Sequence, residues 1–273
     1  MIIVKIVLIA AVVLYVGLTL LLYLLQERMI FFPTREIHVT PAQRGLRFEE
    51  LTLVADDGVR IAAWFVPAPH ARGTVLYLHG NGGNLSHAVE AIETYVRLGV
   101  NVLAIDYRGY GASDGRPSGV GIERDAEAAW RYLREVRSID RESIVVVGRS
   151  LGGGPASMLA ARHAPAGLIL ESTFTSVSDR AAEHFPFIPV RAFLRTRFDV
   201  RANVASVQCP LLVVHSTDDE TIPYRHGVRL FESAREPKEL VTIAHGHNDC
   251  FARSSSIYIP SLDRFLTTVL DGD

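Results

Sequence analysis

Short apolar runs rich in β-branched residues alternate with longer amphipathic stretches along most of this chain. Runs that are apolar on both faces are typical of strands inside a parallel sheet, and successive parallel strands need a crossover, usually helical, between them. The strands that this pattern predicts are Thr74–His79, Asn101–Asp106, Ser143–Gly148, Gly167–Glu171, Leu211–His215 and Glu239–Ala244. The alternation therefore predicts an α/β fold with a mostly parallel sheet of about eight strands and helices on both faces.

Two further strands, Arg47–Val54 and Arg60–Val66, are predicted ahead of this array. They flank Asp57-Gly58, and because Asp-Gly is a favoured two-residue turn we expect an antiparallel hairpin. The amphipathic stretches predict helices near Leu85–Leu98, Gly121–Val136, Leu151–His163, Tyr224–Ala234 and Ser256–Leu270. There is no internal repeat, and 273 residues suit a single domain.

The N-terminal segment is of a different kind. The twenty residues from Ile6 to Leu25 carry no charge, and a helix of that length matches the roughly 30 Å hydrocarbon core of a bilayer. A signal peptide has a shorter apolar core and a small-residue cleavage site, whereas QERMIFFP follows here. A core helix apolar on every face would need a much larger helical protein around it. We therefore expect an uncleaved transmembrane anchor at residues 1–27, a connector at 28–45 and a single α/β domain at 46–273.

Charges beside the apolar segment bear on its orientation in the membrane. Lys5 and the amino terminus flank one side, while Arg28, Arg35, Arg44 and Arg47 flank the other. By the positive-inside rule this excess weakly favours a single-pass protein with its large domain in the cytoplasm.

Overall composition excludes several classes of partner. The formal net charge is −2 and no long run of like charges occurs, so a nucleic-acid partner is not expected. Cys209 and Cys250 form no zinc-type pattern, and the predicted sheet separates them too far for a disulfide. We expect neither a metal nor a cofactor.

Gly148-Arg149-Ser150-Leu151-Gly152 follows one of the predicted strands and opens a predicted helix. In a G-x-S-x-G strand-to-helix turn the serine side chain is held exposed in a strained conformation, and the two glycines allow the chain to reverse. We therefore assign Ser150 as a nucleophile.

A serine nucleophile needs a base that accepts its proton, and a histidine after the last strand is placed to do so. His245 and His247 compete for this role in Ala244-His245-Gly246-His247. His247 is favoured because Gly246 frees the turn before it, while His245 is expected to face solvent or to pack on a neighbour at the strand end.

The histidine in turn needs a carboxylate that orients its ring, expected after the strand Leu211–His215. Three neighbours, Asp218, Asp219 and Glu220, compete there. Two of them are expected to be ordinary loop charges or N-terminal charges of the following helix.

An oxyanion hole requires two backbone N–H donors, which we assign to Leu151 and to Asn81 in His79-Gly80-Asn81-Gly82-Gly83-Asn84. A glycine turn that caps the next helix with Asn84 would explain the same loop. It lacks the spacings of phosphate-binding loops, so nucleotide binding is not expected. Another glycine-dense loop, residues 106–115, is expected to support the serine turn.

Taken together, these motifs resemble those of serine hydrolases with the α/β-hydrolase fold, in particular alpha/beta hydrolase domain-containing proteins with an N-terminal membrane anchor and no large lid. The likeness lies in DDGVRIAAWFVPA (56–68), LHGNGGN (78–84), DYRGYGASDG (106–115), GRSLGG (148–153), STDDETIP (216–223) and HGHND (245–249). The family's D-E-x-x-P acid loop implies that Asp219 is the acid, and its G-H-N-D loop implies that His247 is the base. Ser216 stands where the family commonly has glycine, and His245 stands where it usually has a small residue.

The resemblance implies hydrolysis of a small-molecule or lipid-like acyl ester, or of a thioester. An acyl-protein thioesterase or an acyltransferase would use the same triad. A catalytically silent, membrane-tethered binding protein would be expected to have lost a triad residue or an elbow glycine, and this chain has lost neither. The stretch Ser172–Gln208 is too short for a full lid domain, and its aromatic residues are expected to line an acyl pocket, to face the bilayer or to pack in a small helical excursion.

Overall fold

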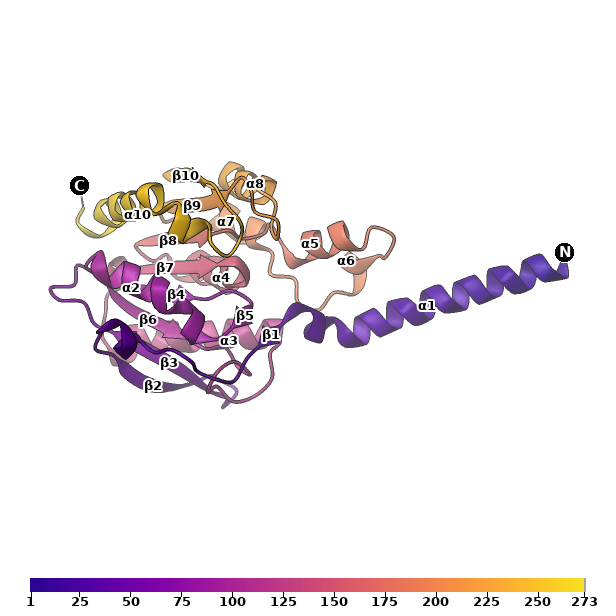
Figure 1. Ribbon diagram of the computed structural model, residues 1–273, viewed down its shortest axis with the longest axis horizontal. Coiled ribbons are helices and arrows are strands. Elements are labelled where there is room, and N and C mark those ends of the chain that lie inside the picture. The colour runs from indigo at the N-terminus through magenta and orange to yellow at the C-terminus, as the bar shows by residue number, and fades with distance from the viewer. Residues whose placement is uncertain (273) are drawn as a thin grey trace.

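The computed structural model describes residues 1–272 and contains one eight-stranded sheet (Figure 1). Its strands lie in the order β10-β9-β8-β7-β4-β6-β3-β2. β2 pairs antiparallel with β3, and β3 pairs antiparallel with β6, while every other pairing is parallel. The strands are β2 (Glu49–Val54), β3 (Arg60–Val66), β4 (Thr74–Leu78), β6 (Asn101–Ile105), β7 (Ile144–Arg149), β8 (Gly167–Glu171), β9 (Leu211–Ser216) and β10 (Lys238–Ile243). The predicted mostly parallel α/β sheet is confirmed.

Helices cover both faces of this sheet. The helices are α2 (Val89–Arg97), α3 (Gly119–Arg131), α4 (Gly153–His163), α7 (Val200–Ser206), α8 (Arg225–Ser233), the short α9 (Cys250–Arg253) and α10 (Ser255–Leu270). Residues of α3, α4, α7 and α8 pack in the core on one face, and residues of α2 and α10 pack in the core on the other. Strand β7 serves both cores, because Val146 faces one and Val147 the other. This alternation is why the central strands are apolar at every position.

The hairpin between β2 and β3 differs from the prediction in its turn. The loop holds three residues, Asp56 to Gly58, because Ala55 donates a backbone hydrogen bond to Val59 across it. Gly58 has φ +83°, the left-handed conformation that ends a three-residue hairpin loop. Asp57 is also engaged elsewhere, since its carboxylate binds the guanidinium of Arg108 at 2.8 Å.

Shorter elements complete the chain. β1 (Phe32–Pro33) pairs in parallel with β5 (Gly82–Gly83), an interaction that the sequence pattern did not predict. Single helical turns occur at Pro41–Arg44, Leu85–Ala88, Arg141–Ser143 and Ser150–Gly152, and a π-helical turn at Tyr132–Val136 ends α3.

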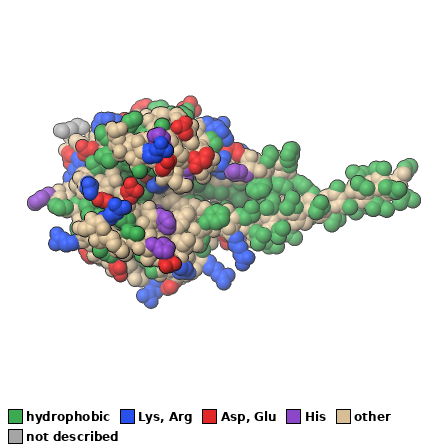
Figure 2. All heavy atoms as spheres, in the orientation of Figure 1, with side chains coloured by type: hydrophobic (Ala, Val, Ile, Leu, Met, Phe, Trp, Pro, Cys, Tyr) green, Lys and Arg blue, Asp and Glu red, His purple; other side chains and the backbone are tan. Residues whose placement is uncertain are grey.

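Helix α1 (Ile2–Ile30) projects away from the sheet (Figure 1). It is long and apolar enough to cross a membrane, a test that a signal sequence also passes. Beside its C-terminal half lie α5 (Val177–His184) and α6 (Val190–Phe193). We call the whole segment of residues 177–195, which includes both helices, the cap. Figure 2 shows apolar side chains along α1 and on the adjoining cap region, while charged side chains gather on the rest of the domain.

Candidate active site

Ser150 stands directly after β7, in a turn that the neighbouring backbone makes very tight. Its φ of +51° lies in the left-handed region, which is strained for a residue with a side chain. A Cβ at Gly152 would lie 2.0 Å from the carbonyl oxygen of Leu78, and one at Gly148 would lie 2.5 Å from the carbonyl oxygen of Gly152. Both glycines of the G-x-S-x-G pattern are therefore required by close backbone approach.

His247 lies within hydrogen-bonding distance of Ser150. Its Nε2 is 3.1 Å from the Ser150 Oγ, and its Nδ1 is 2.7 Å from Oδ2 of Asp219. The histidine is almost fully buried, at 7% exposure. The three residues singled out in the sequence thus form one continuous chain of hydrogen bonds, with the geometry that a serine nucleophile requires.

The carboxylate of Asp219 is fixed from two directions. Its Oδ1 accepts hydrogen bonds from the backbone N–H groups of Thr221 at 2.9 Å and Ile222 at 2.7 Å. Burial raises the pKa of this carboxyl, but the hydrogen bonds with His247 and with the Ile222 N–H outweigh burial and hold the pKa below its usual range. Asp219 therefore stays ionised beside the imidazole at neutral pH.

The two neighbouring carboxylates were expected to be ordinary loop or helix N-terminal charges, and that expectation is wrong. Glu220 Oε2 accepts the backbone N–H of His247 at 3.0 Å, and Asp218 Oδ2 accepts the backbone N–H of His245 at 3.1 Å. The next helix begins only at Arg225. All three acids of one loop thus hold the histidine loop, two through its backbone and one through its ring.

His215, at the end of β9, supports the same loop from below. This fully buried ring binds the carbonyl oxygen of Ile222 through Nε2 at 2.8 Å, and the same nitrogen lies 3.6 Å from Asp219. Burial lowers the pKa of His215, so the ring is neutral and donates to that carbonyl. The sequence predicted His215 only as a strand residue, and nothing in the sequence pattern indicated that its imidazole holds the loop.

The glycine loop after β4 lies beside the serine. A Cβ on Gly80 would be 3.5 Å from the Cβ of Ser150. The side chain of Asn81 donates to the carbonyl of Ile30 at the end of α1, and it accepts from the backbone N–H of Phe32 at 3.2 Å. These contacts hold the side chain of Asn81 against the C-terminal end of α1. Asn84 caps the following helical turn, so the capping role and the position beside Ser150 coexist.

The loop at residues 106–115 supports this glycine loop rather than the serine turn. Tyr107 Oη donates to the carbonyl of His79 at 2.9 Å, and Tyr110 Oη donates to Oδ1 of Asn81 at 3.0 Å. Asp106 accepts the backbone N–H of Leu85 at 2.9 Å. The predicted supporting role is correct in kind, but its target is different.

Comparison with known proteins identifies the family. A family model described as the alpha/beta hydrolase fold matches residues 73–208. The alpha/beta hydrolase domain-containing protein WAV2 of Arabidopsis thaliana is 34% identical to this chain, over 90% of this chain and 89% of that protein. The chain belongs to the alpha/beta hydrolase family.

The chain is also similar to a second curated protein and, in fold, to a solved structure. The uncharacterized protein Rv2307c of Mycobacterium tuberculosis is 35% identical, over 92% of this chain and 90% of that protein. Among solved structures, the Pyrococcus furiosus esterase Pf2001 superposes with a TM-score of 0.74 at 20% identity, over 88% of this chain and 99% of that one. That likeness supports the fold.

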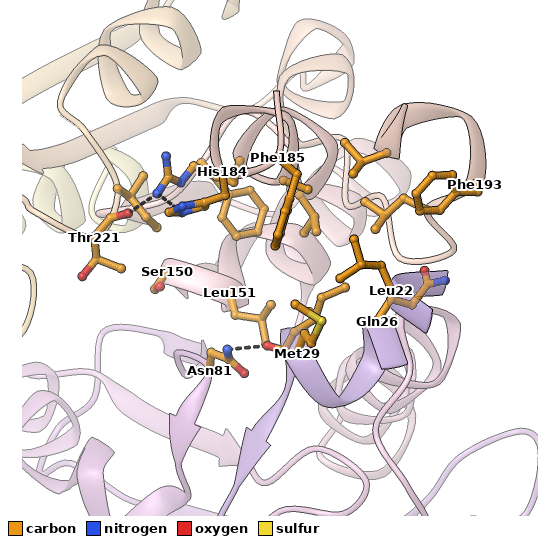
Figure 3. Close-up of a pocket in the computed structure, with 18 residues that line it drawn as sticks. Leu22, Gln26, Met29, Asn81, Ser150, Leu151, His184, Phe185, Phe193 and Thr221 are labelled. Carbon is orange, nitrogen blue, oxygen red and sulfur yellow. Dashed lines mark hydrogen bonds between the residues drawn. The ribbon is translucent and has the colours of Figure 1, made fainter. Parts of the chain in front are cut away.

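Two cavities of this alpha/beta hydrolase meet at Ser150. The first has a volume of about 320 Å³ and is mostly apolar (Figure 3). Its walls come from three places: the end of α1, the cap with the segment before it, and the loops around Ser150. Leu22, Met29, Phe185 and Phe193 point into it, with Ser150 at its far side.

The second cavity, of about 900 Å³, is more polar and lies on the other side of Ser150. His247, Arg149 and the glycine loop line it. Arg149 lies over the ring of Phe251, with its guanidinium carbon 4.6 Å from the ring centre. Ser150, Asn81 and Thr221 line both cavities, so a bond held at Ser150 can have an apolar group on one side and a polar group on the other.

Residues for holding a metal were not expected, and within residues 1–272 no group of three or more suitable side chains comes together. Cys209 and Cys250 are both buried and free.

Sequence reasoning missed the contribution of α1 to the first cavity. Leu22, Gln26, Met29 and Ile30 lie on one face of the helix, at the spacing of successive turns. Gln26 is 5% exposed, and its Oε1 accepts the backbone N–H of Arg195 at 2.7 Å. A glutamine near the end of an apolar helix was the available signal, because a buried amide needs partners.

Proposed function

We propose that this protein is a serine hydrolase that cleaves a carboxylic ester or thioester through an acyl-enzyme intermediate. The observation that carries the proposal is the unbroken chain from Ser150 through His247 to Asp219, with distances of 3.1 and 2.7 Å. Membership of the alpha/beta hydrolase family supports it. Small-molecule and lipid-like acyl esters are the proposed substrates.

In the proposed reaction, Nε2 of His247 takes the proton from Ser150 as the oxygen attacks the acyl carbon. Asp219, which is ionised, stabilises the imidazolium that forms. Backbone N–H groups of Leu151 and Asn81 would donate to the oxyanion of the tetrahedral intermediate. The imidazolium then gives its proton to the leaving alcohol or thiol, and water repeats these steps on the acyl-serine to release the acid.

We also propose that α1 remains attached as a membrane anchor, with the catalytic domain following residues 28–45 and facing the cytoplasm. The contacts of Ile30 and Gln26 with the domain support retention, since cleavage would remove one wall of the apolar cavity. The excess of arginine after the apolar run Ile6–Leu25 supports the cytoplasmic side, which protease protection in intact membrane vesicles tests.

Fluorophosphonate labelling tests the chemical part of the proposal. Ser150→Ala should abolish both covalent labelling and ester hydrolysis while the fold stays intact, because the hydroxyl supplies the attacking oxygen and little packing. Ser255, a second serine that lines the polar cavity, provides the control, and Ser255→Ala should label normally. Labelling that persists in Ser150→Ala would contradict the assignment.

A further inference from the structure

The cap follows α1 well into its apolar part. Arg195 donates its backbone N–H to Gln26, and its guanidinium carbon lies 4.3 Å from the ring centre of Tyr23. Phe193 packs edge-on against Tyr23, with ring centres 6.2 Å apart. Further toward the N-terminus, the hydroxyl of Tyr15 donates to the carbonyl of Phe187 at 3.0 Å. The cap therefore contacts the helix at three successive levels.

These contacts place the tip of the cap, residues 185–189, beside the apolar part of α1. Tyr15 precedes Tyr23 by two helical turns, which at 1.5 Å per residue is about 12 Å along the axis. Tyr15 also lies inside the uncharged run from Ile6 to Leu25. If α1 crosses a bilayer, Phe187 must therefore sit among lipid chains.

The composition of the cap agrees with such a position. Its tip, Phe185–Pro189, has the sequence FPFIP, and the Phe187 side chain is 88% exposed, which is unusual for a large apolar residue in water. Charged residues lie on both sides of this tip in the sequence. Asp179 before it pairs with Arg191 after it at 2.8 Å. An apolar tip with charged flanks is typical of segments inserted partly into a membrane.

The apolar cavity connects this region to the serine. Leu22 and Met29 of α1 form one wall and Phe185 and Phe193 of the cap form the other, while Ser150 stands at the inner end (Figure 3). The outer part of the cavity thus lies between two elements that would both touch lipid.

We propose that the cap tip inserts into the bilayer beside α1, and that the acyl chain of a membrane-resident lipid ester passes between them to reach Ser150. This inference rests on the proposed function and assigns its substrate class. Leu22 and Phe193 act as chain-length determinants, and the polar cavity with Arg149 receives the headgroup side of the ester.

The first experiment measures acyl specificity of the full-length protein in phosphatidylcholine vesicles. Leu22→Trp fills the cavity, so it should lower the ratio of hexadecanoyl to acetyl ester hydrolysis by about tenfold or more. Leu24→Trp is the matched control, because Leu24 lies two residues on and is 62% exposed. An unchanged ratio in Leu22→Trp, or an equal change in both variants, would overturn the assignment of the cavity.

The second experiment measures insertion without using activity. Brominated phospholipids should quench the fluorescence of the tryptophan added in Phe187→Trp. They should not quench the tryptophan added in Val136→Trp, which is also at an exposed apolar position but lies outside the cap and α1. Equal quenching of the two variants would overturn the insertion of the tip.

The two proposals fail in different ways. If the unmodified protein shows neither Ser150-dependent labelling nor hydrolysis of either ester, the proposed hydrolase is wrong, and the substrate assignment falls with it. Hydrolysis of the acetyl ester that depends on Ser150, with no response of the chain-length ratio to Leu22→Trp, would leave the hydrolase standing and remove only the lipid route.

Discussion

The two sides of Ser150 are held in opposite ways. On one side, the loop of His247 is fixed by three neighbouring carboxylates, each with its own hydrogen bond of 2.7 to 3.1 Å. On the other side, α1 and the cap meet mainly through apolar side chains, with Gln26 among the few polar links. Hydrogen bonds fix atoms to fractions of an ångström, whereas apolar walls define a volume. We infer that the first side sets the chemistry and the second sets the choice of substrate.

The largest expected effect lies on the hydrogen-bonded side. His247→Ala should lower turnover of an activated ester about as far as Ser150→Ala does, roughly 10⁶-fold, because residues that act as a unit lose their effect together. His245→Ala should lose far less, since the loop uses the backbone of His245 for its hydrogen bonds. If the two histidine variants exchange ranks in the turnover assay, the proposed base is wrong.

The three carboxylates offer a finer test of the same side. Asp219→Asn should keep the shape of the loop but disfavour the productive tautomer of His247, lowering turnover by roughly 10⁴-fold, the magnitude known for a serine protease. Asp218→Asn and Glu220→Gln should change turnover by less than about tenfold, because an amide oxygen still accepts a backbone N–H. A large loss confined to Asp218→Asn would move the acid one residue upstream.

On the apolar side, we expect an effect on local stability rather than on chemistry. Gln26→Ala leaves the backbone N–H of Arg195 without its acceptor, at a cost of about 1 to 3 kcal/mol. Amide exchange at Arg195 should therefore become about tenfold faster or more, while exchange in α4 should not change. Unchanged exchange at Arg195 would show that apolar packing alone holds the cap.

The smallest expected effect concerns the tie between the cap and α8. Glu183 binds Arg225 at 2.8 Å and lies 3.3 Å from His226. Burial raises the pKa of Glu183, but hydrogen bonds from Arg225 and Arg180 outweigh burial and lower it from 4.5 to about 2. A lowered pKa means that the stabilisation is complete above about pH 4.5 and is lost as the pH falls toward 2.

Glu183→Gln should accordingly cost about 1 kcal/mol or less at neutral pH, because this group is at the surface. The difference from the unmodified protein should shrink as the pH falls through that window. Glu236→Gln provides the control, since its carboxylate is 77% exposed and lies 4.0 Å from Lys238. Chemical denaturation at a series of pH values measures both variants.

The same contrast explains how much the sequence could predict. The strands and the serine turn carry local signals, such as the apolar run of β7 and the paired glycines, and their positions were predicted to within a few residues. His247 and Asp219 lie in short loops next to strand ends, so their convergence follows from the parallel sheet. Ranking the three carboxylates needed the family resemblance, because adjacent residues of one loop differ only in where the backbone points them.

The features that the sequence did not predict depend on contacts between segments that lie far apart in the chain. The apolar residues of α1 satisfy the pattern of a membrane helix whether or not they also line a cavity, so the pattern carries no sign of the second role. The pairing of β1 with β5 joins two residues to two glycines, which is too short to leave a periodicity. The roles of Glu220 and Asp218 could not be predicted because each contacts a backbone N–H, and a backbone partner leaves no trace in side-chain chemistry.

Membrane anchors are commonly treated as interchangeable parts. Helix α1 cannot be exchanged in this way, because its last turns line the cavity beside Ser150 and its final carbonyl, that of Ile30, accepts a hydrogen bond from the side chain of Asn81. A chimera with an unrelated apolar helix in place of α1 would alter both the cavity and the support of the glycine loop. In the anchor role that we propose for α1, one stretch of chain both holds the protein in the membrane and lines the cavity beside Ser150, so that neither role can be exchanged without the other.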